Sequence, residues 1–220
     1  MFFITFAKNL ILNTSTMKNI LFTFLTIILL FSCSKKDDPI APDPLQKLPP
    51  ETQTGANTFG CVINNQVFYP RDGTSALLSP GGKGYIFWGA PGGNREFNEI
   101  EVRNLKDAKP ANSMLIHLQG LDQTGVGEYI WQPSNFQSSI DGLMQNYVFA
   151  KIFDATVNSW QYYGSYENSG KVIITRYDFI NKIFSGTFSG QLRLRNGSSE
   201  IDIINGRFDI GPGLGNKVFP

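Results

Sequence analysis

Short segments in which apolar and polar residues alternate follow one another from residue 57 to residue 210. In the clearest segment, residues 183–195, one face is mostly polar and the other carries Phe184, Gly186, Phe188, Gly190, Leu192 and Leu194. Such alternation predicts a strand with one wet side, as antiparallel sheets allow. The glycines on the inward face predict bends or the close approach of another strand.

Ten further segments have the composition or the alternation of strands: 58–63, 66–69, 85–90, 99–103, 114–119, 125–131, 147–153, 160–165, 171–177 and 200–210. Asn64 and Asn65 tolerate positive φ and predict a two-residue hairpin turn. Residues 133–142 are polar, with room for one helical turn. We expect an all-β domain over residues 56–220, an antiparallel β-sandwich or a flattened barrel of about ten strands.

The same pattern assigns side chains to faces. In 99–103, Ile100 and Val102 should point inward, and Glu99 and Glu101 outward. In 114–119, His117 falls on the more polar face. We therefore expect a surface histidine and two solvent-exposed carboxylates.

An apolar run from Ile20 to Phe31 precedes the domain. A membrane-spanning helix needs about 20 apolar residues, so this run fits the apolar region of a signal peptide better. Lys18 supplies the positive charge before it, and no acidic residue occurs before Asp37. We expect a signal peptide over residues 1–32, with Met17 as the more natural start than Met1.

The end of this run, Leu30-Phe31-Ser32-Cys33, resembles the lipobox of bacterial lipoproteins. The resemblance implies cleavage before Cys33, lipidation of that cysteine and an outer-membrane lipoprotein anchored by its acyl chains. Residues 34–38 partly resemble the surface-display signal of Bacteroidota lipoproteins, so the cell surface and the periplasmic face both stay open. Residues 33–55 are rich in proline, which predicts an extended linker of about 3 Å per residue.

Two motifs carry a further resemblance. Residues 48–62 read LPPETQTGANTFGCV, and the chain closes on SGTF at 185–188 and NGRFD at 205–209. Both are similar to motifs of a family of small uncharacterised Bacteroidota lipoproteins. Because that family has a domain of unknown function, the resemblance implies no catalytic residues.

The numbers of charged, cysteine and histidine residues argue against several classes of function. Without residues 1–32, the chain keeps 188 residues with 17 basic and 18 acidic side chains. This balance argues against nucleic acid as a partner. With Cys33 lipidated, Cys61 has no disulfide partner and is expected to be a small buried hydrophobe. With His117 as the single histidine, we expect no metal site, no catalytic residue and no cofactor.

Aromatic residues are enriched in two parts of the chain. Seven lie between Tyr147 and Tyr166, and a second cluster spans 85–88. Such rings suit binding faces that are apolar on one side and wet on the other. The candidate ligand-binding residues are Trp160, Tyr162, Tyr163 and Trp88. Alternation places Trp160 and Tyr162 on one face and Tyr163 on the other; rings that fill the core are the alternative.

The sequence therefore favours a non-enzymatic binding or accessory module of the cell envelope, with a glycan, a peptide or another envelope protein as partner. A lipocalin-like carrier of a small apolar ligand is one alternative, and an envelope hydrolase is another. A closed cavity would indicate the carrier, a flat exposed aromatic strip the binding module, and a cleft with several buried carboxylates the enzyme.

Overall fold

The structure is a computed structural model that describes residues 44–74, 81–89, 95–106 and 112–220. The predicted signal peptide, Cys33 and the first part of the linker lie outside these residues. The described residues belong to one compact unit. Within them, no helix combines the length and the hydropathy needed to cross a bilayer.

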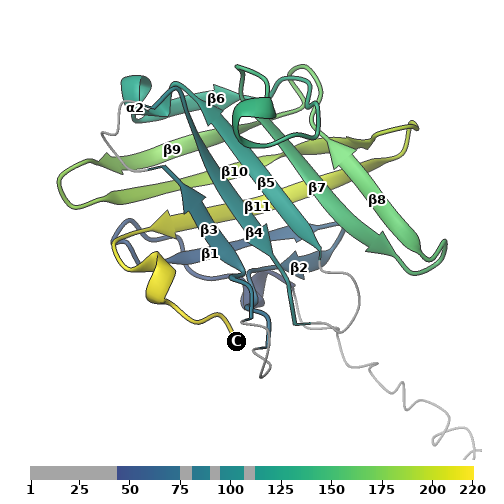
Figure 1. The fold of residues 1–220 in the computed structure, drawn as a ribbon, viewed down its shortest axis with the longest axis horizontal. Coiled ribbons are helices and arrows are strands. Elements are labelled where there is room, and N and C mark those ends of the chain that lie inside the picture. Colours follow the sequence, from purple (N-terminus) through teal and green to yellow (C-terminus); the bar gives the residue numbers. More distant parts are fainter. Residues whose placement is uncertain (1–43, 75–80, 90–94, 107–111) are drawn as a thin grey trace, which may run out of the picture. The chain divides into compact units, whose positions relative to one another are not determined.

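Eleven antiparallel strands form one open sheet in the described part of the chain, which confirms the all-β prediction (Figure 1). The strands are β1 (Thr58–Ile63), β2 (Gln66–Phe68), β3 (Tyr85–Trp88), β4 (Phe97–Arg103), β5 (Ser113–Gln119), β6 (Gly127–Ile130), β7 (Tyr147–Asp154), β8 (Ser159–Gly164), β9 (Gly170–Asp178), β10 (Ile183–Leu194) and β11 (Glu200–Ile210). The short helical turns are η1 (Pro44–Lys47), α2 (Leu121–Thr124), η2 (Ser139–Asp141) and η3 (Leu214–Asn216). The β1–β2 hairpin turns at Asn64 and Asn65, both with positive φ, as predicted.

The sheet divides at β10. One edge of β10 pairs with β11, whereas the other pairs first with β9 and then, at Arg193 and Leu194, with β8. The strand order is therefore β2-β1-β11-β10-β8-β7-β5-β4-β3, with β9 and β6 on a side branch. This division folds the sheet on itself, so that β3, β4, β5 and β7 cross in front of β9, β10 and β11 (Figure 1).

Aromatic rings fill the space between the two layers. Ring centroids lie 5.2 Å apart for Phe87 and Phe184, 5.1 Å for Phe184 and Phe208, and 5.4 Å for Phe59 and Phe188. Gly186 allows this packing, because a Cβ there would lie 2.7 Å from the Phe208 ring and 2.5 Å from a backbone oxygen of β9. The expectation of close approach at the inward glycines of β10 is met at this position.

The end of the predicted linker lies against the sheet. Residues 52–56 wrap around the carboxylate of Asp209, which is buried on β11. Its two oxygens accept hydrogen bonds from Thr52 Oγ1 (2.6 Å), Thr54 N (3.0 Å), Gly55 N (2.9 Å), Ala56 N (3.0 Å) and Ser185 Oγ (2.7 Å). The two motifs of the family resemblance thus meet at one carboxylate, and these linker residues are part of the packed domain.

The prediction that His117 and Glu99 are exposed to solvent is wrong. His117 and Glu99 are each only 1% exposed, and His117 Nδ1 lies 2.9 Å from Glu99 Oε1. The segment between β6 and β7 folds over this outer face, and Ser139 N donates to the same Glu99 oxygen at 2.8 Å. The His117 ring stacks between Phe97 and Tyr147. Alternation assigns a face correctly but does not reveal that a later segment covers it.

Candidate functional site

A pocket opens beside β3, the last strand of the sheet path. We call it the β3 pocket; it is lined by Tyr85 and Phe87 of β3, Phe184 of β10, Ile210 of β11 and Leu214 of η3, among others. Its volume is about 430 Å³, within the range of roughly 300 to 1,000 Å³ that is typical of small-molecule sites. It exists because β3 pairs with β4 on one edge only, while β11 and η3 pass its other edge.

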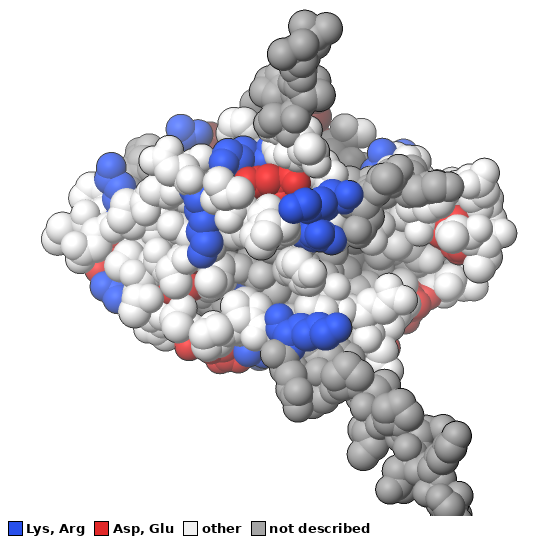
Figure 2. Space-filling model, turned by 90° about the horizontal axis from the view of Figure 1, so that it is seen from below, with Lys and Arg blue, Asp and Glu red and all other residues white. Residues whose placement is uncertain are grey.

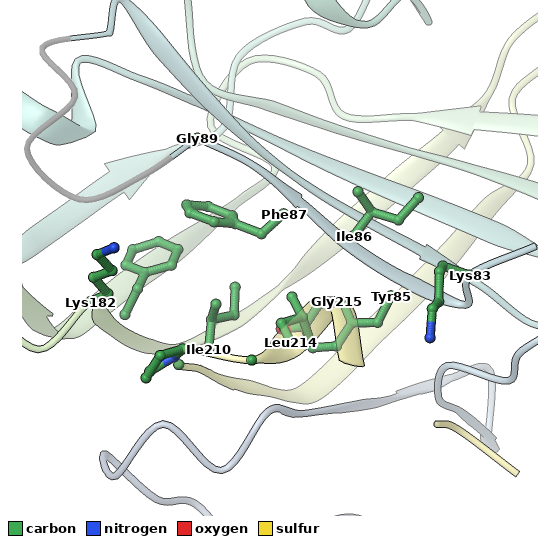
Figure 3. Close-up of a pocket in the computed structure, with 13 residues that line it drawn as sticks. Lys83, Tyr85, Ile86, Phe87, Gly89, Lys182, Ile210, Leu214 and Gly215 are labelled. Carbon is green, nitrogen blue, oxygen red and sulfur yellow. The ribbon is translucent and has the colours of Figure 1, made fainter. Parts of the chain in front are cut away.

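The walls of the β3 pocket are mostly apolar. Phe87 projects from β3, and Ile210 and Leu214 lie on the opposite wall (Figure 3). Gly211, Gly213 and Gly215 also line this wall. At Gly215 an added Cβ would meet nothing within 4 Å, so this position has room for a side chain.

Tyr85, which lines the β3 pocket, carries a hydroxyl that is closed to solvent. Tyr85 is 1% exposed, and its hydroxyl has no hydrogen-bond partner among the described residues. Burial raises the pKa of Tyr85 well above its ordinary value, and the charge of Asp209 raises it further. The hydroxyl therefore stays protonated and offers a donor with nothing in the described domain to receive it, which is an energetic cost in a buried environment.

Two lysines mark opposite ends of the pocket (Figure 3). Lys83 is engaged elsewhere, because its Nζ donates to Lys217 O at 3.0 Å and lies 3.7 Å from Asp72. The C-terminal segment is held in the same way by Lys217, whose Nζ donates to Ala56 O. Seen from below, the molecule carries Lys and Arg side chains at several places, with Asp and Glu among them (Figure 2). Lys182, in the turn between β9 and β10, is the exposed cation at the other end.

The candidate aromatic residues do not form one site. Trp160 and Tyr162 share the outer face of β8, where Lys151 Nζ lies 4.3 Å and 5.5 Å from their ring centroids. Trp160 also makes an edge contact with Phe153. Tyr163 points the other way and packs against the core, as alternation predicts. Lys151 thus covers one face of the Trp160 ring.

Trp88 lies apart from these three, at the end of β3. Its side chain is 52% exposed, and its indole Nε1 donates to Glu101 Oε2 at 3.4 Å. Tyr85 and Phe87, which line the β3 pocket, belong to the aromatic cluster at 85–88 but were not among the candidate residues. The glycines at 211, 213 and 215 on the opposite wall were not recognised in the sequence either.

The charged groups of the described residues do not gather into a metal site: no three His, Cys, Asp or Glu side chains come together there. Cys61 is fully buried in the core, and its burial raises its pKa, which keeps the thiol protonated. No family model, no curated protein and no solved structure matches this chain.

Proposed function

We propose that this protein is a lipid-anchored binding module of the cell envelope that holds a small apolar ligand in the β3 pocket. The observation that carries the proposal is an apolar pocket of small-molecule size, and the buried, unpaired hydroxyl of its lining residue Tyr85 supports it. An apolar ligand would displace water from Phe87 and Leu214. The Tyr85 hydroxyl is closed to solvent, so a small shift of the rings around it would let an acceptor oxygen on the ligand receive its hydrogen.

The chemistry around Tyr85 favours a neutral acceptor over a carboxylate. The negative charge of Asp209 raises the pKa of Tyr85, so the same charge disfavours an anion bound at that hydroxyl. An alcohol, ketone or ester oxygen accepts the hydrogen bond without this repulsion. The open side of the pocket and the ring-filled core favour this binding module over a carrier with an enclosed lumen.

Features of the sequence support the lipid anchor. The apolar run before Cys33 and its resemblance to a lipobox support lipidation of Cys33, and the linker would then display the domain from the outer membrane, on the cell surface or the periplasmic face. A Cys33→Ser variant should lose acyl labelling and appear in the soluble fraction after cell breakage. Unchanged membrane fractionation of the variant would refute this part of the proposal.

The binding site is tested by filling it. Gly215→Phe adds a ring at a position with open space, so we expect the domain to stay folded and its affinity for octanol to fall by about tenfold or more, the cost of losing much of the apolar contact. Gly215→Ala, which leaves the pocket open, is the matched control. Octanol binding that is equal in both variants, measured by NMR titration of purified protein, would contradict the proposed site.

A further inference from the structure

A second pocket lies at the other end of β11. We call it the β2 pocket; it is lined by residues of β2, by the beginning of β5, by the β7–β8 hairpin and by Ile201 at the start of β11. Ile210, at the opposite end of β11, lines the β3 pocket. The β2 pocket has a similar volume, about 410 Å³, but its lining is mostly polar and rich in carboxamides.

Two of these carboxamides are fixed in orientation. Asp202 N donates to Asn64 Oδ1 at 3.0 Å, and Phe153 N donates to Asn112 Oδ1 at 3.1 Å. Because a backbone N–H must meet an oxygen, the position of each amide oxygen follows from its partner. The Nδ2 groups of both side chains have no hydrogen-bond partner among the described residues, so each presents donors that are already oriented.

Asn104 is held in a similar way, since Lys106 N donates to its Oδ1 at 3.3 Å. Gln66, Gln161 and Ser113 add further polar groups to the lining. Tyr163 and Ile152, which pack against the core, supply an apolar surface beside them. The β2 pocket therefore combines several neutral hydrogen-bonding groups with one apolar wall.

The charge of the lining narrows the ligand class. Asp154 is the ionisable acid among the described lining residues, and its carboxylate already accepts from Thr156 N at 2.8 Å and Thr156 Oγ1 at 2.6 Å. Lys, Arg and His are missing from the described lining. A pocket of this kind offers no cation to an anionic ligand and many partners to a neutral polar one.

We propose that the β2 pocket binds a neutral saccharide. Ring hydroxyl oxygens would accept from the oriented amides of Asn64 and Asn112, hydroxyl hydrogens would reach the glutamine oxygens, and a C–H face would lie on Tyr163. This site goes beyond the β3 pocket and does not depend on it, because the two pockets share none of their lining residues. The domain would thus bind two chemically different ligands at opposite ends of β11.

The test is saturation-transfer NMR on the purified protein with the methyl glycosides of glucose, galactose and N-acetylglucosamine. Asn112→Asp and Asn64→Asp keep the oxygen that accepts the backbone N–H and remove the Nδ2 donors. We expect at least one of the three sugars to bind and each substitution to weaken that binding by about three- to tenfold, the worth of one hydrogen bond. Asn196→Asp, which makes the same charge change in the exposed turn after β10, should leave it unaltered.

Three results would contradict the proposal. No saturation transfer to any of the three glycosides would exclude the neutral saccharide. Equal binding by the wild type, Asn112→Asp and Asn64→Asp, with unchanged thermal midpoints, would place the sugar elsewhere. Triglycine that binds with the same dependence on Asn112 while the sugars do not would assign the pocket to a peptide. Octanol should not compete with the sugar, because the two pockets share no lining residue. A failure of the saccharide site can therefore be distinguished from a failure of the β3 pocket.

Discussion

Tyr85 carries a hydroxyl that is buried without a partner among the described residues. Leaving a buried donor unpaired costs about 1–3 kcal/mol, so this side chain lowers the stability of the ligand-free domain. A ligand with an acceptor oxygen would recover that free energy on binding. The Tyr85 hydroxyl therefore lowers the stability of the ligand-free domain but should strengthen ligand binding.

Tyr85→Phe separates these two effects. Removal of the hydroxyl should leave the free energy of unfolding unchanged or raise it, because no hydrogen bond to a described residue is lost. Affinity for octanol should fall by about three- to tenfold, the worth of one hydrogen bond, whereas affinity for octane should not change. Thermal denaturation and NMR titrations with both compounds measure this. If the affinity for octanol matches that of the wild type, Tyr85 does not contact the ligand oxygen.

Asp209 makes the stability of the domain depend on pH. Burial raises the pKa of its carboxyl, but the hydrogen bonds from Thr52, Ala56, Ser185 and Gly55 outweigh burial and lower the pKa to about 2. Because the folded pKa lies below the unfolded value of about 3.9, the stabilisation is complete above pH 4 and is lost as the pH falls towards 2.

Asp209→Asn should remove about 2 kcal/mol of stability at neutral pH and flatten the loss between pH 4 and pH 2. Urea denaturation at a series of pH values measures both effects. Asp141→Asn, at an exposed carboxylate of η2, is the control and should behave like the wild type. An Asp209→Asn variant with the wild-type pH dependence would show that another group titrates in this range.

The segment between β6 and β7 is held on the sheet by Glu99 of β4. One oxygen of this carboxylate lies within hydrogen-bond distance of His117 Nδ1 and also accepts a hydrogen bond from the Ser139 backbone N–H. The same segment exposes Ile140 and Met144 to solvent, so apolar burial of these side chains does not hold it down. Tyr147 Oη also donates to Gln137 O at 2.8 Å, so the polar contacts to Glu99 are one part of what holds the segment.

Glu99→Leu should therefore loosen this segment around Ser139. The substitution leaves the buried His117 nitrogen and the Ser139 N–H without their acceptor, and an unpaired buried polar group costs about 1–3 kcal/mol. Amide hydrogen exchange at Ser139 should become much faster. Glu101→Leu, on the outer face of the same strand, is the control. Slow exchange at Ser139 in Glu99→Leu would show that the segment is held by other contacts.

At the scale of elements, local signals identified most strands. Alternation and turn residues marked β1 and β2, β10 and β11, and the inward glycines of β10. The division of β10 between β9 and β8 was not predictable, because it depends on which distant strands meet its edge after Gly190. The burial of His117 was missed for a similar reason, since a segment that follows β6 covers the face on which it lies.

At the scale of the whole molecule, the all-β class followed from the sequence, whereas the β3 pocket did not. Its aromatic wall lies in the recognised cluster at 85–88, but its other wall comes from residues 210–215, far along the chain. Only the folded sheet brings the free edge of β3 beside η3. The aromatic enrichment around Trp160 is explained by contacts with Lys151, Phe153 and the core, which makes it mainly a packing feature.

The most direct test of this account is a crystal structure of the protein with octanol. We expect the alkyl chain between Phe87, Phe184 and Leu214, and the octanol oxygen within hydrogen-bond distance, about 2.5–3.0 Å, of the Tyr85 hydroxyl. An octanol molecule bound elsewhere, or a β3 pocket that stays empty at saturating octanol, would contradict the proposal that this pocket is the binding site.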